Sequence, residues 1–203
     1  MHGMGDQRHF LDKVVSGGQD GADRAGLEAA ARPGLRTGGW APADFRTAHG
    51  PEPALAAFGL CALPAQGTWA QQYTVRSMRN VDEADATVAF RLGPSPGTDR
   101  TIGYAATRKW RDLRRPEPPA SLRYEEIDSA HRPVFVVRSL DEPRGAAIAL
   151  AAFIQRRRVK ALNVCGHRAW PAVPNFGEHV QSLLIHALRP FSAHAWLMPT
   201  ATR

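Results

Sequence analysis

The stretch Lys13–Ala31, KVVSGGQDGADRAGLEAAA, decides the fold class. A β-branched run leads into a turn with three glycines, and small residues then recur at helical spacing. This order predicts a strand, a glycine-rich turn and a helix whose small side chains lie close on a sheet. Asp20 is placed to be the N-cap of that helix. Free N–H groups and the dipole at a helix start favour negative charge, so the turn predicts an anion-binding loop; an ordinary tight turn is the alternative.

Composition limits the possible functions. The 203 residues are 43% hydrophobic and 22% charged, which is enough for one well-buried domain and short for two. We therefore expect a single domain over residues 1–203 with its core in 13–188. A formal charge of +7 favours anionic partners, but 26 basic against 19 acidic residues is not the density of a dedicated nucleic-acid binder. A small anionic ligand or a solvated basic surface explains the charge equally well. No nucleic-acid partner is expected.

The cysteines and the lengths of the apolar runs indicate in which cellular compartment the protein is expected. Cys61 and Cys165 lie far apart and show neither a disulfide framework nor a metal-ligand spacing, so no metal site is predicted and a reducing cytoplasm is expected. No stretch approaches the roughly 18 uninterrupted apolar residues that span a bilayer. The first residues contain no apolar targeting segment, and we expect no membrane partner.

The plan of residues 13–31 returns later in the chain. ATVAF at 86–90 predicts a buried strand, and GPSPGTDRT at 93–101 predicts a second glycine-rich turn before a helix. Further strands are expected at 133–137 and 161–164. Further helices are expected at 70–81, 144–158 and 175–188, the last opening on Asn175 and Glu178, which resemble a capping box. This alternation predicts an α/β fold, a mostly parallel sheet with helices on both faces, and a ligand cleft where the two turns meet.

Two segments show no regular period. Residues 35–53 predict a long irregular connection, in which Trp40 either stacks on a flat ligand or fills the core. Residues 110–131 predict a surface insertion outside the core. The helix at 70–81 has a polar face with Arg76, and Arg79 lies beside it; these arginines either meet the bound anion or stay solvated.

Five motifs in sequence order carry a resemblance. They are SGGQDGADR at 16–24, GGWAP at 38–42, RNV at 79–81, GTDRT at 97–101 and LNVCG at 162–166. Together they resemble the motifs of the molybdenum cofactor carrier family, a branch of the SLOG group of Rossmann-like nucleotide-binding proteins. The resemblance implies a Rossmann-like three-layer sandwich that forms a homo-oligomer. It also implies a ligand between the two glycine loops: molybdenum cofactor (molybdopterin, a pterin carrying a phosphate) or a nucleotide, which the protein would carry or store.

The motifs and the turn chemistry together predict the ligand-binding residues. These are Gly17, Gly18, Gln19, Asp20, Gly21, Trp40, Arg79, Asn80, Gly97 and Thr98. Asp20 departs from the family, which has threonine there. Its carboxylate either repels a bound phosphate or holds a divalent cation such as magnesium that bridges to the ligand. The run Trp40-Ala41-Pro42-Ala43-Asp44 also departs, since the family has a thiol and a lysine in it.

Two further functions stay open. Related phosphoribohydrolases cleave a base from a nucleoside monophosphate with a PGGxGTxxE loop, and this chain has Thr101 at the position of the catalytic glutamate. Without that carboxylate the sequence favours a binding protein over an enzyme, and no catalytic residue is predicted. A nucleotide-sensing module would use the same cleft as a carrier, so sequence does not separate the two.

Overall fold

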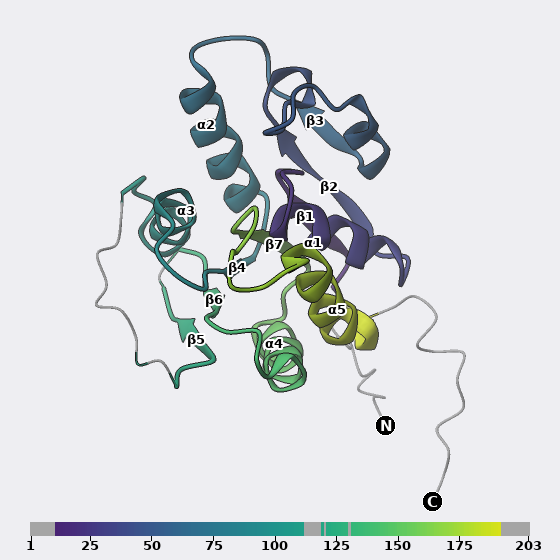
Figure 1. Ribbon diagram of the computed structural model, residues 1–203, viewed down its shortest axis with the longest axis vertical. Helices are drawn as coiled ribbons and strands as arrows, with labels where there is room; N and C mark the ends of the chain where they lie inside the picture. The colour runs from purple at the N-terminus through teal and green to yellow at the C-terminus, as the bar shows by residue number, and fades with distance from the viewer. Residues whose placement is uncertain (1–10, 112–118, 120, 130, 192–203) are drawn as a thin grey trace, which may run out of the picture.

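A seven-stranded sheet organises the chain in the computed structural model, which describes residues 11–111, 119, 121–129 and 131–191. The strands lie in the order β3-β2-β1-β7-β4-β6-β5, and within the described residues β5 alone runs antiparallel (Figure 1). The strands are β1 Lys13–Ser16, β2 Arg36–Ala41, β3 Leu60–Ala62, β4 Ala86–Phe90, β5 Tyr124–Ile127, β6 Val134–Val137 and β7 Ala161–Gly166. The helices are α1 Ala22–Ala31, α2 Trp69–Asp82, α3 Pro96–Thr107, α4 Pro143–Arg157 and α5 Phe176–Leu188, with short 3-10 helices η1 Ala43–Phe45, η2 Pro53–Phe58 and η3 Arg189–Phe191.

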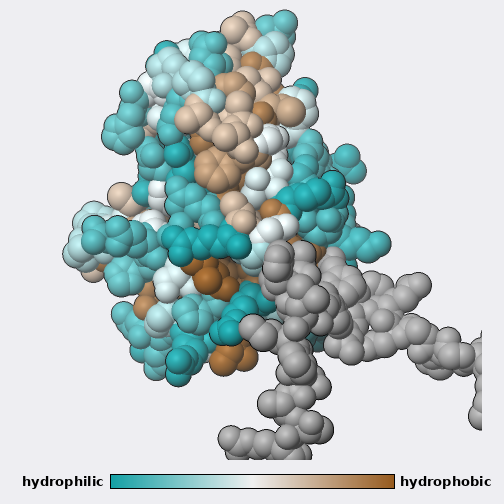
Figure 2. All heavy atoms as spheres, turned by 90° about the vertical axis from the view of Figure 1, so that its right-hand side faces the viewer, coloured by the Kyte–Doolittle hydropathy of each residue, from teal (hydrophilic) through white to brown (hydrophobic). Residues whose placement is uncertain are grey.

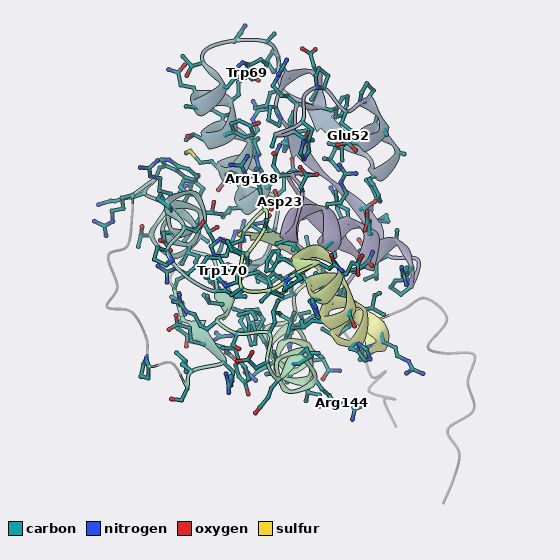
Figure 3. The ribbon with its side chains drawn as sticks, viewed as in Figure 1. Asp23, Glu52, Trp69, Arg144, Arg168 and Trp170 are labelled. Carbon is teal, nitrogen blue, oxygen red and sulfur yellow. The ribbon has the colours of Figure 1, made fainter. Side chains whose placement is uncertain are left out.

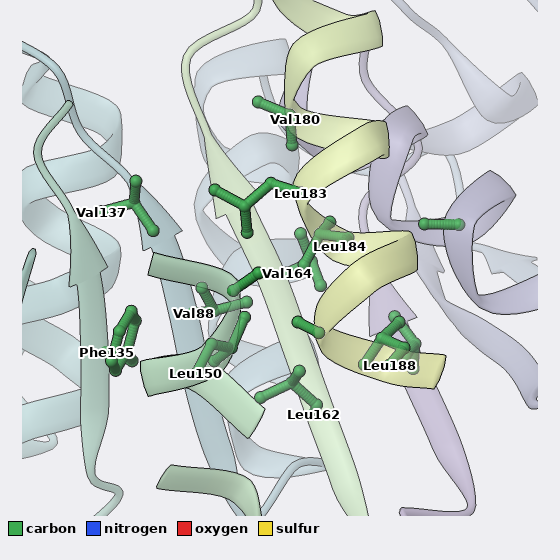
Figure 4. Packing of buried hydrophobic residues seen from close by; sticks show 14 of the residues in the cluster. Val88, Phe135, Val137, Leu150, Leu162, Val164, Val180, Leu183, Leu184 and Leu188 are labelled. Atoms are coloured by element: carbon green, nitrogen blue, oxygen red, sulfur yellow. The ribbon is translucent and has the colours of Figure 1, made fainter. Parts of the chain in front are cut away.

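Helices cover both faces of the sheet, so the structure is the Rossmann-like three-layer α/β sandwich that the sequence predicts. Alternate residues of β4 point to opposite faces. Val88 and Phe90 pack in the larger cluster with α1, α4 and α5, whereas Ala89 packs in the smaller cluster with α2 and α3. Figure 4 shows the larger cluster, where Leu183 and Leu184 of α5 meet the strands.

Small side chains bring α1 close to the sheet, as the helical spacing predicts. A Cβ on Gly26 would lie 2.7 Å from Val164 of β7, so the helix axis approaches the strand to a distance that only glycine permits at this position. The neighbouring alanines of α1 are fully or almost fully buried. The strand, turn and helix at the start of the chain are therefore rigidly joined to the centre of the sheet.

The irregular connection expected at 35–53 is wrong in its first part, because residues 36–41 form β2. Its glycines lower β propensity, yet they let neighbouring groups approach. Gly39 has φ +123°, and a Cβ there would lie 2.4 Å from the carbonyl oxygen of Ser16 on β1. Parallel pairing with β1 on one side and β3 on the other supplies the hydrogen bonds that stabilise this strand.

Two smaller expectations are also corrected. The segment 110–131 does not lie wholly outside the core, because β5 pairs with β6 and buries Ile127; residues 112–118, 120 and 130 lie outside the described residues. The capping box of α5 is absent: Asn175 takes the left-handed conformation with φ 54° and makes no side-chain cap. A complete capping box instead opens α2, between Thr68 and Gln71.

The face that carries η2 and α1 has a mixed surface. Figure 2 shows apolar residues gathered in its upper part, where η2 and β3 lie, with hydrophilic residues to either side. Ala54, Ala56 and Ala57 of η2 are exposed there. Across the described part of the chain, no helix has the length and apolar character needed to cross a membrane.

Candidate functional site

A cavity of about 580 Å³ lies at the carboxyl ends of β1, β7 and β4, the edge where open α/β sheets bind ligands. Residues from the β1–α1 turn, the first two thirds of α2, the start of α3 and the end of β7 with the segment after it line the cavity. Figure 3 shows Asp23 and Arg168 close together in this region, between α2 and α1. The two glycine-rich turns therefore do border a common cleft.

An ion pair forms one wall of the cavity. Arg76 Nη1 lies 2.7 Å from Asp23 Oδ2, and the two side chains are only 12% and 5% exposed. Burial raises the pKa of Asp23, although Arg76 and the backbone N–H groups of Gln19 and Gly17 act in the opposite direction. A Cβ on Gly17 would fall 1.4 Å from Arg76 Nη1, so this glycine makes room for the guanidinium. Arg76 is thus the α2 arginine that reaches the cavity.

The start of α1 is already hydrogen-bonded by the protein itself. Ala22 N–H donates to the His167 carbonyl at 3.0 Å, and Arg24 N–H donates to the Gln19 carbonyl at 2.9 Å. Asp23 adds a negative charge within the first turn. Two of the N–H groups at the start of this helix therefore have partners in the chain.

The expected N-cap at Asp20 is wrong, because Gly21 is the N-cap and no side chain caps α1. Gly21 has φ +79°, and a Cβ there would lie 2.2 Å from the Arg168 carbonyl oxygen, so the chain turns where only glycine fits. Asp20 points elsewhere: it lines a second hollow of about 420 Å³ and lies 3.3 Å from His49. Gly21 borders that same hollow.

The start of α3 is open to the cavity. Its N-cap, Ser95, makes no side-chain cap, and Pro96 has no N–H, so the first donors are the backbone N–H groups of Gly97 and Thr98. A Cβ on Gly97 would meet nothing within 4 Å. Asp99 holds this turn in place through a charge-assisted hydrogen bond of 2.8 Å from Arg91 Nε. Two N–H groups and a helix dipole therefore face a cavity with space for an anion.

Three predicted site residues lie together but outside the cavity lining. Asn80 accepts the Trp40 N–H at 2.7 Å and donates to the Trp40 carbonyl at 3.2 Å, which ties α2 to β2. The Arg79 guanidinium lies 4.2 Å from the centre of the Trp40 ring, and the indole N–H donates to Glu83. Trp40 thus neither walls the cavity nor fills the core, and Arg79 stacks on it at the surface.

Three described residues of the cavity lining have a buried side-chain atom without a partner: Arg76, through Nε, and two residues that offer acceptors. Gln19 is 4% exposed; its Nε2 donates to the Arg46 carbonyl at 2.8 Å, and its Oε1 has no partner. His167 is 8% exposed, and its Nε2 has none either. Burial lowers the pKa of His167 despite a hydrogen bond to the Gly93 backbone, so the ring is neutral near pH 7. The ring lies 4.6 Å from Trp170, centre to centre.

The remaining lining residues give the cavity a positive character. Arg100 and Arg168 border it in addition to Arg76, and among the described residues of the lining Asp23 is the one acidic side chain. Cys165 also borders it, and burial raises the pKa of this thiol far above its usual range, so the sulfur stays protonated. Within the described residues, no group of three or more His, Cys, Asp and Glu side chains is placed to hold a metal ion.

Only some of the predicted ligand-binding residues line the cavity. Gln19, Gly97 and Thr98 line the cavity; Gly17 lies beneath Arg76, and Gly18 is packed against Leu55 and Leu60. The sequence analysis weighed Arg76 as an anion contact but did not include it among the ligand-binding residues, and it missed His167 and Arg168. For these two a signal existed, because they directly follow a predicted buried strand, where parallel sheets place functional groups.

Comparison with known proteins identifies the family to which this fold belongs. The model of the circularly permutated YpsA SLOG family matches residues 14–117, just over half of the chain. The chain belongs to this family. In this member of the circularly permutated YpsA SLOG family the last strand, β7, lies at the centre of the sheet between β1 and β4, an order compatible with a permuted chain.

A solved structure extends the similarity beyond the matched segment. This SLOG family member resembles the crystal structure of "Putative molybdenum carrier protein" from Syntrophus aciditrophicus SB, with 25% sequence identity and a TM-score of 0.68. The similarity covers 90% of this chain and 98% of the other. No curated protein matches the chain. The family resemblance inferred from the five motifs is therefore confirmed.

Proposed function

We propose that the protein binds a phosphate-bearing pterin or nucleotide in the 580 Å³ cavity and carries or stores it, with molybdenum cofactor as the first candidate. The observation that carries the proposal is the uncapped start of α3, where the Gly97 and Thr98 N–H groups face the cavity. Arg168 and Arg100 add positive charge beside it. The family and the name of the similar structure support a ligand-carrying role.

The cavity residues fit the organic part of molybdenum cofactor. A phosphate would accept hydrogen bonds from the α3 N–H groups, and the unpartnered Gln19 Oε1 and His167 Nε2 would accept hydrogen bonds from a heterocycle. Tyr73 and Trp110 add aromatic surface to the lining, against which a flat ring can pack. When bound, the cofactor would supply the metal; the protein's own groups would orient and shield its pterin.

Gly97→Val tests the proposal directly. The side chain would project from the open start of α3 into the space of the bound phosphate, so we expect affinity for molybdenum cofactor or a nucleoside monophosphate to fall at least about tenfold, or about 1.4 kcal/mol. Gly145→Val is the matched control: Gly145 also lies in the first turn of a helix, and a Cβ there meets nothing within 4 Å. Isothermal titration measures both, and an unchanged affinity in folded Gly97→Val contradicts the proposal.

A hydrolase that cleaves nucleoside monophosphates is the second candidate. One observation favours it: the Asp23 carboxylate lies in the cavity, and burial raises its pKa in the direction expected of a general acid. Against it, Asp23 is paired with Arg76, and the Thr101 hydroxyl donates to the Gly97 carbonyl at 3.0 Å. Incubation with a nucleoside monophosphate separates the candidates, since free base and ribose phosphate form only with a hydrolase.

The identity of the ligand, its retention and the assembly need separate measurements. Mass spectrometry of small molecules released from purified protein distinguishes a pterin with molybdenum from a nucleotide, which would favour the sensing module. The homo-oligomer implied by the family resemblance stays a prediction that sedimentation velocity tests. The cytoplasmic location also stays a prediction.

A further inference from the structure

The cavity has two buried hydrogen-bond acceptors whose roles are defined by their other contacts. Gln19 donates its amide N–H to the Arg46 carbonyl, which identifies the unpartnered atom as the oxygen. One His167 nitrogen is hydrogen-bonded to the Gly93 backbone, and the ring is neutral, so the unpartnered Nε2 has a lone pair and no proton. Both atoms are therefore hydrogen-bond acceptors that lack a donor.

Unpaired buried acceptors are rare because a buried polar atom without a partner is unfavourable. Gln19 and His167 are each more than nine-tenths buried, and they come from two different turns that meet at one cavity. Packing holds both side chains: His167 lies against Trp170 and Phe176, and Gln19 is anchored on Arg46. Neither acceptor is a loose surface group, and the partner they lack is best supplied by a ligand.

The start of α3 has the opposite chemistry, since it offers donors. The cavity is thus lined by N–H donors in one part and, in another, by two residues that each hold a buried, unpartnered acceptor. A ligand that satisfies both carries a phosphate and N–H groups on its ring. A 2-amino-4-oxo pyrimidine ring, which pterins and guanine share, provides such N–H groups.

We infer that Gln19 Oε1 and His167 Nε2 are specificity-determining acceptors that select phosphate-bearing ligands with a 2-amino-4-oxo pyrimidine ring. This inference rests on the proposed function and refines it. GMP and IMP are the probes, because they share the phosphate and the sugar and differ by the 2-amino group. The parent protein should bind GMP about tenfold more tightly than IMP.

Gln19→Met and His167→Phe remove the acceptors and keep similar volume. The ratio of the IMP to the GMP dissociation constant should fall toward one in the variant that removes the acceptor of the 2-amino group. If the other acceptor bonds the ring N–H that GMP and IMP share, its loss should weaken both ligands alike. Gln181→Met is the control, because Gln181 lies on α5 and bonds Glu28 away from the cavity. The control should keep the ratio of the parent.

The outcomes separate the inference from the proposed function. Equal binding of GMP and IMP to the parent, or an unchanged ratio in both acceptor variants, overturns the inference; the proposed function stands if Gly97→Val weakens binding at least about tenfold. If neither nucleotide binds but molybdenum cofactor does, both acceptor variants must bind the cofactor more weakly than Gln181→Met, and equal affinities overturn the inference. If none of the three ligands binds, the proposed function fails and the inference fails with it.

Discussion

The two glycine-rich turns look alike in sequence and differ in use. After β1, Asp23 and the carbonyls of Gln19 and His167 occupy the start of α1, and Gly17 and Gly21 are glycines because other protein groups lie against them. After β4, no side chain caps α3, and Gly97 has open space in front of it. A glycine turn before a helix therefore indicates either close packing or a ligand, and only the neighbouring groups decide which.

The largest expected effect is on the buried ion pair of the first turn. Arg76→Met should lower the free energy of unfolding by about 3–5 kcal/mol near pH 7, because it leaves the Asp23 carboxylate buried without its cation. Urea unfolding measures this. Arg79→Met is the control on the same helix and should cost at most about 1 kcal/mol, since it loses only an exposed contact with Trp40.

The pH dependence sharpens that test. Burial raises the folded-state pKa of Asp23 above the ordinary value of an aspartate, so the folded protein holds this proton more tightly than the unfolded chain. The contribution of Asp23 to stability is therefore most favourable at low pH and declines as pH rises through the folded pKa. The loss in Arg76→Met should shrink on acidification, and a loss that does not depend on pH would show that the cation is not what Arg76 contributes.

A smaller change in stability is expected from a glycine-to-alanine substitution in each of the two turns. Gly21→Ala should cost at least about 1–3 kcal/mol, because its φ of +79° strains any other residue and its Cβ would meet the Arg168 carbonyl. Gly97→Ala should leave stability unchanged or raise it by up to about 1 kcal/mol, because alanine favours a helix. Thermal unfolding of both variants decides whether the turns differ as described; equal losses would mean that they do not.

The smallest effect is expected at Asp20. This carboxylate lines the second hollow beside His49, so Asp20→Thr should change the affinity of the 580 Å³ cavity for a nucleoside monophosphate less than about twofold. Titration with and without magnesium checks this. Tighter binding by tenfold would place the carboxylate within reach of the phosphate, and weaker binding only in the presence of magnesium would place a bridging cation there.

Much of the fold follows from local patterns. β1, β4, β6 and β7 are predicted because apolar runs of strand length mark buried parallel strands, and α1 is predicted because its small residues recur at helical spacing. β2 and β3 are missed, because glycines and a three-residue length leave no local period to detect. β5 is missed because its half-exposed sequence YEEI becomes a strand only beside β6.

The sequence by itself determined the α/β class, the family and the two turns that border the cleft, since periodicity and ordered motifs are properties of the chain alone. Only the tertiary structure decided which groups face the cleft. Arg76 reaches it and Arg79 does not, although they lie three positions apart on one helix, because the space left by Gly17 admits one guanidinium and Trp40 holds the other. His167 enters the site because β7, late in the chain, lies between β1 and β4, a neighbourhood that no local pattern encodes.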